Sequence, residues 1–208
     1  MTLITSLVEF RQNVTKVNSY IELAYEQDSS SNNLRTGEEI EFLVTSAFLK
    51  LFIAWESFLE KSFISYLTGE ESLDGNQLVR YASPVDEKHA HRILIGTQNY
   101  VAWSNNEIVN KIAGLYFENS EPYLTALNSI SRDLSDLRVI RNASAHISSS
   151  TQTKLDAVAS RVLGTPISNI GVSDLVTRIS PEDNTKTILQ MYQLKLDISA
   201  ENIAHNRT

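Results

Sequence analysis

Cysteine is absent from the sequence, and its 208 residues include only 7 glycines and 4 prolines. Without cysteine the chain forms no disulfide and offers no thiolate to a metal, and a reducing cytoplasm is the simplest compartment for it. Few glycines and prolines mean few helix breaks, and no turn dipeptide joins two alternating apolar runs as a β-hairpin requires. These absences favour an all-α fold.

A leader peptide and a membrane span are also missing by sequence criteria. Residues 1–11 lack the basic start and the long apolar run of a signal peptide. The most apolar stretch, residues 44–59, is interrupted by Lys50 and Glu56, which argues against a membrane span. We therefore expect a cytoplasmic protein with no membrane partner.

Positive charge is in deficit, with 18 Lys and Arg residues against 25 Asp and Glu residues and a net charge of −7. A protein that coats nucleic acid needs many Lys and Arg contacts to phosphate, so this class is disfavoured. An enzyme that grips one or two phosphates in a local basic cleft is still compatible with such a balance.

The length and the 42% hydrophobic content fit one domain with a sizeable core. We expect a single all-α domain over residues 1–208, a bundle of about five to eight helices. Ser173 and Ser180 are predicted N-caps, with Pro181 at a first helical position. The last helix should bury Ile188, Met191, Leu194 and either Leu196 or Ile198. Apolar periodicity and helix-end residues predict helices at residues 3–27, 37–68, 86–95, 105–117, 122–146, 151–163 and 181–204.

The helix predicted at residues 122–146 has a regular apolar stripe that an arginine interrupts. The stripe consists of Leu127, Ile130, Leu134 and Leu137, at the three-and-four spacing of a core-facing surface. The next position in this spacing is Arg141. A guanidinium in a buried stripe costs several kcal/mol unless it is paired or reaches water. Such a departure from the pattern often marks a functional site.

Four polar residues share one side of this helix. At about 100° per residue, Arg138, Arg141, Asn142 and His146 fall within an arc of roughly 140°. Arginine is a permanent cation suited to phosphate, histidine titrates near neutral pH, and an amide can orient its neighbours. Cleavage of a phosphodiester by a 2′-hydroxyl needs a proton shuttle and a cation on the developing phosphorane, and this set supplies both.

Two segments resemble a known family. The motif R-N-x-x-x-H after a long helix, at residues 141–146, is similar to the signature of HEPN domains. The aromatic-rich segment at residues 47–60, with Trp-Glu-x-Phe-Leu-Glu, resembles the RiboL-PSP-like branch of that family. The resemblance covers residues 38–205. It implies an HEPN-like helical bundle and a metal-independent endoribonuclease of a toxin–antitoxin or anti-phage system, with RNA as substrate.

The resemblance also implies roles for the residues. His146 would act as general base or general acid, and Arg141 would stabilise the phosphorane. Asn142 would orient the histidine or the phosphate, and the product would be a 2′,3′-cyclic phosphate. A homodimer would join two R-x4-H helices in a composite site, an antitoxin or other protein partner is possible, and no metal or cofactor is required.

Each candidate also has a structural interpretation. Arginine and histidine commonly stabilise helix C-termini, and this would explain Arg141 and His146 without a catalytic role. Glu56 either orients Arg141 or another arginine in the site, or is solvated or paired for structural reasons. Arg138 either extends the phosphate grip or pairs with Asp133 or a neighbouring helix.

The remaining motifs are weaker. Ser144 either hydrogen-bonds substrate or only packs. His89 and His91, two residues apart, point to different sides of a helix, and no nearby ligand set completes a metal site. The alternative function is a non-catalytic helical interaction or nucleotide-binding module that acts through a protein partner, which the acidic balance favours.

Overall fold

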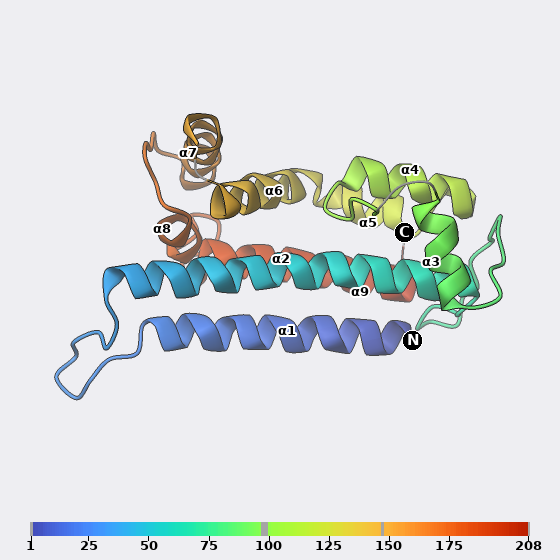
Figure 1. Ribbon diagram of the computed structural model, residues 1–208, viewed down its shortest axis with the longest axis horizontal. Coiled ribbons are helices and arrows are strands. Elements are labelled where there is room, and N and C mark those ends of the chain that lie inside the picture. Colours follow the sequence, from blue (N-terminus) through green and yellow to red (C-terminus); the bar gives the residue numbers. More distant parts are fainter. Residues whose placement is uncertain (1, 97–99, 147, 208) are drawn as a thin grey trace. The chain divides into compact units, whose positions relative to one another are not determined.

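The computed structural model describes residues 2–96, 100–146 and 148–207, and this part of the chain is all-α (Figure 1). The predicted fold class is confirmed. A single 3-10 turn, η1 (Glu118–Ser120), precedes α5. The α-helices of the described ranges are α1 (Leu3–Ala24), α2 (Gly37–Thr68), α3 (Glu87–Ile95), α4 (Asn106–Tyr116), α5 (Tyr123–Ser129), α6 (Ser131–Ala145), α7 (Ser149–Leu163), α8 (Val172–Thr177) and α9 (Ile188–His205).

The chain divides into two compact units. The first comprises residues 1–11, 55–134 and 195–208, and the second comprises residues 12–54 and 135–194. Four helices, α1, α2, α6 and α9, therefore contribute residues to both units.

Aromatic packing holds the first unit together. Phe63 is fully buried, and its ring lies 4.8 Å from Phe117 and 5.1 Å from Tyr123 between centroids. The hydroxyl of Tyr123 shares a 3.1 Å hydrogen bond with Ser62, so its only polar atom is satisfied in the core. Burial raises the pKa of the Tyr123 hydroxyl well above its ordinary value.

A second aromatic group in the same unit contains the tryptophan of the Trp-Glu segment. Trp55 stacks on Phe58 at 5.8 Å, and Phe10 of α1 meets the Trp55 ring edge-on at 5.9 Å. Trp55 is 1% exposed. Within the Trp-Glu-x-Phe-Leu-Glu stretch, the apolar residues Trp55, Phe58 and Leu59 are therefore core residues of the first unit.

Capping boxes define the starts of α2 and α9. At the start of α2, the Thr36 hydroxyl accepts from the Glu39 amide, and the Glu39 carboxylate accepts from the Thr36 amide. Thr187 and Gln190 form the same pair of hydrogen bonds at the start of α9. The prediction that the last helix begins at Pro181 is therefore wrong. Ser180 caps only a short turn by accepting from the Glu182 amide.

Two further details of the prediction also need correction. Ser173 is not an N-cap, because α8 begins at Val172 and Gly171 occupies the cap position. In α9, Ile188 and Leu196 are buried as expected, but Leu194 is 44% exposed.

The predicted motif helix is two helices. Its backbone departs from helical angles at Ile130 (φ −120°, ψ 21°), where α5 ends and α6 begins. With this division the described residues form nine α-helices, one more than the upper end of the expected range of five to eight.

One described helix, α2, is long and apolar enough to cross a membrane by length and composition. Half of its most apolar window is buried inside the protein. Val44, Phe48 and Leu51 are each fully buried, as in the core helix of a soluble protein.

Candidate functional site at the end of α6

The predicted site residues lie at the C-terminal end of α6 in the second unit. Arg138, Arg141, Asn142 and His146 are all exposed. Two of them, Arg138 and Asn142, lie on the side of the helix opposite to the buried side. At about 100° per residue, Arg138 and Asn142 lie about 160° from Ile140, which is fully buried.

Arg141 holds the next position of the stripe, but its side chain is not buried. Within α6 the buried positions after Leu137 are Ile140 and Ala143, and Arg141 faces solvent. Leu127, Ile130, Leu134 and Leu137 are all buried, as the stripe predicts, and Arg141 lies beyond the last of them, near the C-terminal end of α6. Arg141 therefore reaches water without the cost of a buried charge.

Arg141 and Asn142 interact directly. Nη1 of Arg141 donates a 3.3 Å hydrogen bond to Oδ1 of Asn142. Neither Arg141 nor His146 forms an ion pair with any residue in the described ranges. The guanidinium and the imidazole are both available to a ligand.

The turn after His146 is fastened to the start of α7. The Thr151 hydroxyl donates to the His146 carbonyl oxygen at 2.9 Å and accepts from the Ser148 amide at 2.8 Å. The Ser148 hydroxyl accepts in turn from the Thr151 amide, which completes a capping box. The N-cap of α7 thereby fixes the backbone of His146.

A groove of about 220 Å³ runs along the exposed side of α6. Its two cations, Arg138 and Lys154, make no ion pair with residues of the described chain. The predicted alternative partner of Arg138, Asp133, pairs instead with Lys195 at 2.9 Å. The groove is therefore a local basic site on an acidic protein. It is lined by Ser135, Arg138, Val139, Asn142, Thr151 and Lys154.

A buried carboxylate anchors α6 within the second unit. Asp136 is 6% exposed, accepts from the Tyr192 hydroxyl of α9 at 3.2 Å, and pairs with Arg161 of α7. A buried charge is tolerated when it is paired and hydrogen-bonded in this way. These contacts hold α6 against the helix that carries Lys154 and Thr151.

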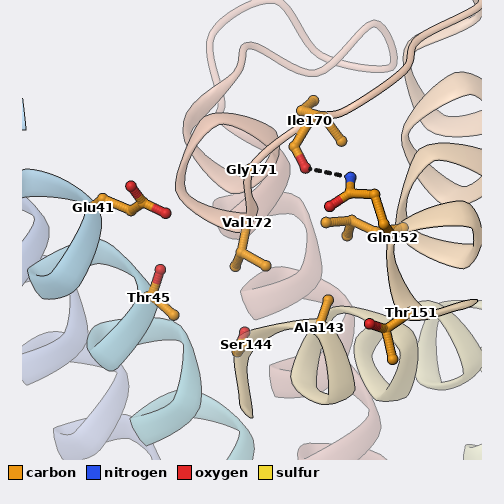
Figure 2. A pocket seen from close by; sticks show the side chains of 10 residues that line it. Glu41, Thr45, Ala143, Ser144, Thr151, Gln152, Ile170, Gly171 and Val172 are labelled. Carbon is orange, nitrogen blue, oxygen red and sulfur yellow. Dashed lines mark hydrogen bonds between the residues drawn. The ribbon is translucent and has the colours of Figure 1, made fainter. Parts of the chain in front are cut away.

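A smaller pocket of about 100 Å³ lies on the neighbouring side of the α6 end (Figure 2). Ser144 lines it, but its hydroxyl already donates to the Ile140 carbonyl at 2.8 Å, which accounts for the serine inside a helix. The pocket is lined by Glu41 and Thr45 of α2, Ala143 and Ser144 of α6, Thr151, Gln152 and Leu155 of α7, and Ile170, Gly171 and Val172.

Glu56 belongs to the first unit, whereas Arg141 belongs to the second. Glu56 is partly exposed, and no ion partner is found for it among the described residues of its own unit. Its pairing with an arginine of the site stays a prediction.

The two neighbouring histidines have other partners. His89 accepts from the Val85 amide at 3.3 Å, and His91 lies 3.5 Å from Glu60. No group of three or more potential metal ligands occurs within residues 2–96, 100–146 and 148–207.

Sequence reasoning missed Lys154, Thr151 and Glu41. Thr151 carried a usable signal, because Ser148-x-x-Thr151 has the spacing of a cap. Lys154 and Glu41 lie on other helices, and only the fold brings them to the end of α6.

No family model, curated protein or solved structure matches this chain.

Proposed function

We propose that the protein is a metal-independent endoribonuclease of the HEPN type. The observation that carries the proposal is the exposure of Arg141, Asn142 and His146 together at one helix end. They lie beside a groove whose two cations form no ion pair with a described residue. One scissile phosphate requires local positive charge, and the net charge of −7 over the whole chain disfavours broad binding to nucleic acid. A toxin–antitoxin or anti-phage setting suits such an enzyme.

In the proposed reaction, His146 takes the proton of a ribose 2′-hydroxyl. The 2′-oxygen then bonds to phosphorus, and the bond between phosphorus and the 5′-oxygen breaks. Arg141 offsets the negative charge of the phosphorane, and Asn142 holds the guanidinium through the Nη1–Oδ1 hydrogen bond. The products are a 2′,3′-cyclic phosphate and a 5′-hydroxyl.

The leaving 5′-oxygen must receive a proton, and one histidine does not conveniently serve as both base and acid. We place the second histidine on a second copy of the chain, related by a two-fold axis. The exposed position of His146 supports this arrangement, because a second subunit can approach it from solvent. In the alternative function, the same groove binds a nucleotide or a partner without cleavage.

The decisive experiment incubates the purified protein with single-stranded RNA in excess EDTA. We expect cleavage that leaves 2′,3′-cyclic phosphate ends, and loss of at least about a hundredfold in rate for Arg141→Ala and His146→Ala. Arg132→Ala is the matched control, because Arg132 is an exposed arginine of α6 outside the groove.

Circular dichroism should show the same helix content in all three variants. Undiminished cleavage by His146→Ala, or dependence on added Mg²⁺, would reject the proposal. RNA binding without any cleavage would support the non-catalytic alternative.

A further inference from the structure

We propose that the pocket beside Ser144 binds the Watson–Crick edge of a guanine base, adjacent to the phosphate that the basic groove holds. This inference rests on the proposed function and names the substrate feature that the same site recognises. The pocket of about 100 Å³ has room for the edge of a base rather than for a whole nucleotide. Single-stranded RNA exposes such edges, and proteins read them by hydrogen bonds.

The orientation of the Gln152 amide is fixed. Its Nε2 donates to Asp156 Oδ1 at 2.8 Å and to the Ile170 carbonyl at 2.9 Å, and both partners are acceptors. The amide therefore cannot be flipped, and Oε1 is left as an acceptor. Figure 2 shows the bond to Ile170, with the amide oxygen turned toward Val172.

Two side chains of α2 complete the polar wall. The carboxylate of Glu41 forms no ion pair or hydrogen bond with a described residue. The hydroxyl of Thr45 likewise forms no hydrogen bond with a described residue. In Figure 2 both groups extend from α2 toward the segment that contains Val172. Such a carboxylate at a pocket is a strong hydrogen-bond acceptor for the donors of a ligand.

The pocket is consequently rich in acceptors. The Ser144 hydroxyl has committed its proton to Ile140, which leaves its lone pairs, and Glu41 and Gln152 offer only acceptor oxygens. Among the side chains that line the pocket, the Thr45 hydroxyl is the one donor not already bonded to a described acceptor. The matching ligand carries adjacent N–H donors and one acceptor.

Among the four RNA bases, guanine fits this pattern best. Its N1–H and exocyclic amino group are adjacent donors that suit the two oxygens of one carboxylate, and its O6 can accept from Thr45. Uracil has a single ring N–H between two carbonyl acceptors, which would face the acceptors of the pocket. Ala143, Ile170 and Val172 supply apolar contacts for the base.

Thr151 connects this pocket to the proposed catalytic region. It lines both the pocket and the groove of Arg138 and Lys154, and its hydroxyl binds the His146 carbonyl. A nucleotide with its base in the pocket therefore has its phosphate close to the groove.

The test measures binding of guanosine 3′-monophosphate, inosine 3′-monophosphate and uridine 3′-monophosphate to the full chain by calorimetry. Inosine lacks only the exocyclic amino group. We expect guanosine monophosphate to bind at least about tenfold more tightly than either competitor, and Glu41→Gln to remove this preference. Glu38→Gln, on the same helix but outside the pocket, is the control and should retain it.

The failures of the two proposals are distinguishable. Cleavage of RNA with no preference for guanine, in binding or in product ends, would overturn the base pocket and leave the ribonuclease intact. Preferential guanosine binding without cleavage by the wild type would support the pocket and reject the ribonuclease. Binding of lysine amide or arginine amide, with none of guanosine monophosphate, would assign the pocket to a basic side chain of a protein partner and overturn the inference.

Discussion

The hydroxyl of Thr151 donates a 2.9 Å hydrogen bond to the carbonyl oxygen of His146. This bond joins the first turn of α7 to the end of α6, so the helix cap and the position of the candidate catalytic histidine depend on one side chain. Thr151 is a positioning residue in this arrangement, because it acts through the backbone of His146.

Replacement of Thr151 should therefore impair catalysis more than folding. We expect Thr151→Val to lower the rate of RNA cleavage by about tenfold or more, because a displaced histidine is badly positioned to take the proton of the 2′-hydroxyl. The loss of the cap should cost about 1 kcal/mol in the free energy of unfolding.

Steady-state cleavage and urea denaturation measure the two effects. Thr151→Ser should restore the rate, since serine keeps the hydroxyl. Thr153→Val, on the exposed side of the same helix, serves as the control. Equal cleavage rates for Thr151→Val and the wild type would remove the positioning role.

Arg138 and Lys154 should contribute to RNA affinity through charge. Each phosphate contact on a single strand adds about 0.7 to the slope of log K against log salt, so Arg138→Ala and Lys154→Ala should each reduce that slope by about this amount. Fluorescence anisotropy with a labelled single-stranded RNA at several salt concentrations gives the slope. Arg132→Ala should leave it unchanged, and a similar reduction for Arg132→Ala would mean that the groove is not the binding site.

The loop before α8 should open at low pH. Burial raises the pKa of Asp156, but hydrogen bonds from the Asn169 amide, Gln152 and the Ile170 amide outweigh it, and the pKa falls below the ordinary 3.8. Because the folded-state pKa is depressed, the stabilising contribution of Asp156 is complete above pH 3.8. It is lost as the pH falls below that value toward the folded pKa.

Amide NMR signals of Asn169 and Ile170 can follow this transition. Asp156→Asn should loosen the same segment at neutral pH and weaken guanosine binding, because the single acceptor oxygen of asparagine cannot serve Gln152 and the Asn169 and Ile170 amides as two carboxylate oxygens do. Unchanged hydrogen exchange at both amides in Asp156→Asn would contradict the assignment.

Asp136 should matter for stability rather than for chemistry. Asp136→Ala leaves Arg161 and the Tyr192 hydroxyl without their buried acceptor, and we expect a loss of about 2 kcal/mol in the free energy of unfolding. The exposed pair of Asp174 and Arg178 is the comparison, where Asp174→Ala should cost less than about 0.5 kcal/mol. Chemical denaturation of both variants measures the difference. Losses of equal size would show that Asp136 is not a buried anchor.

Local signals predicted much of the fold. The end of α2 at Gly69 (φ +99°) and the end of α7 at Gly164 (φ +69°) follow from glycine's access to left-handed backbone. The start of α9 was missed because Ser180-Pro181 has the composition of an N-terminus. The capping box seven residues later, Thr187 with Gln190, forms the actual one.

The site was partly predictable for a physical reason. Arg138, Arg141, Asn142 and His146 are close in sequence, so helical geometry alone places them on one side of α6. Glu41, Gln152 and Lys154 come from α2 and α7, and no periodicity within α6 specifies them. The break at Ile130 was invisible to an apolar pattern that both helices satisfy.

The two sides of α6 have different roles. Asp136, Leu137 and Ile140 hold the helix in place, whereas Arg138 and Asn142 project on the other side and carry no share of the packing. Libraries randomised at positions 138, 142 and 154 should thus yield mostly folded proteins. The exposed side can therefore be re-engineered without rebuilding the scaffold beneath it.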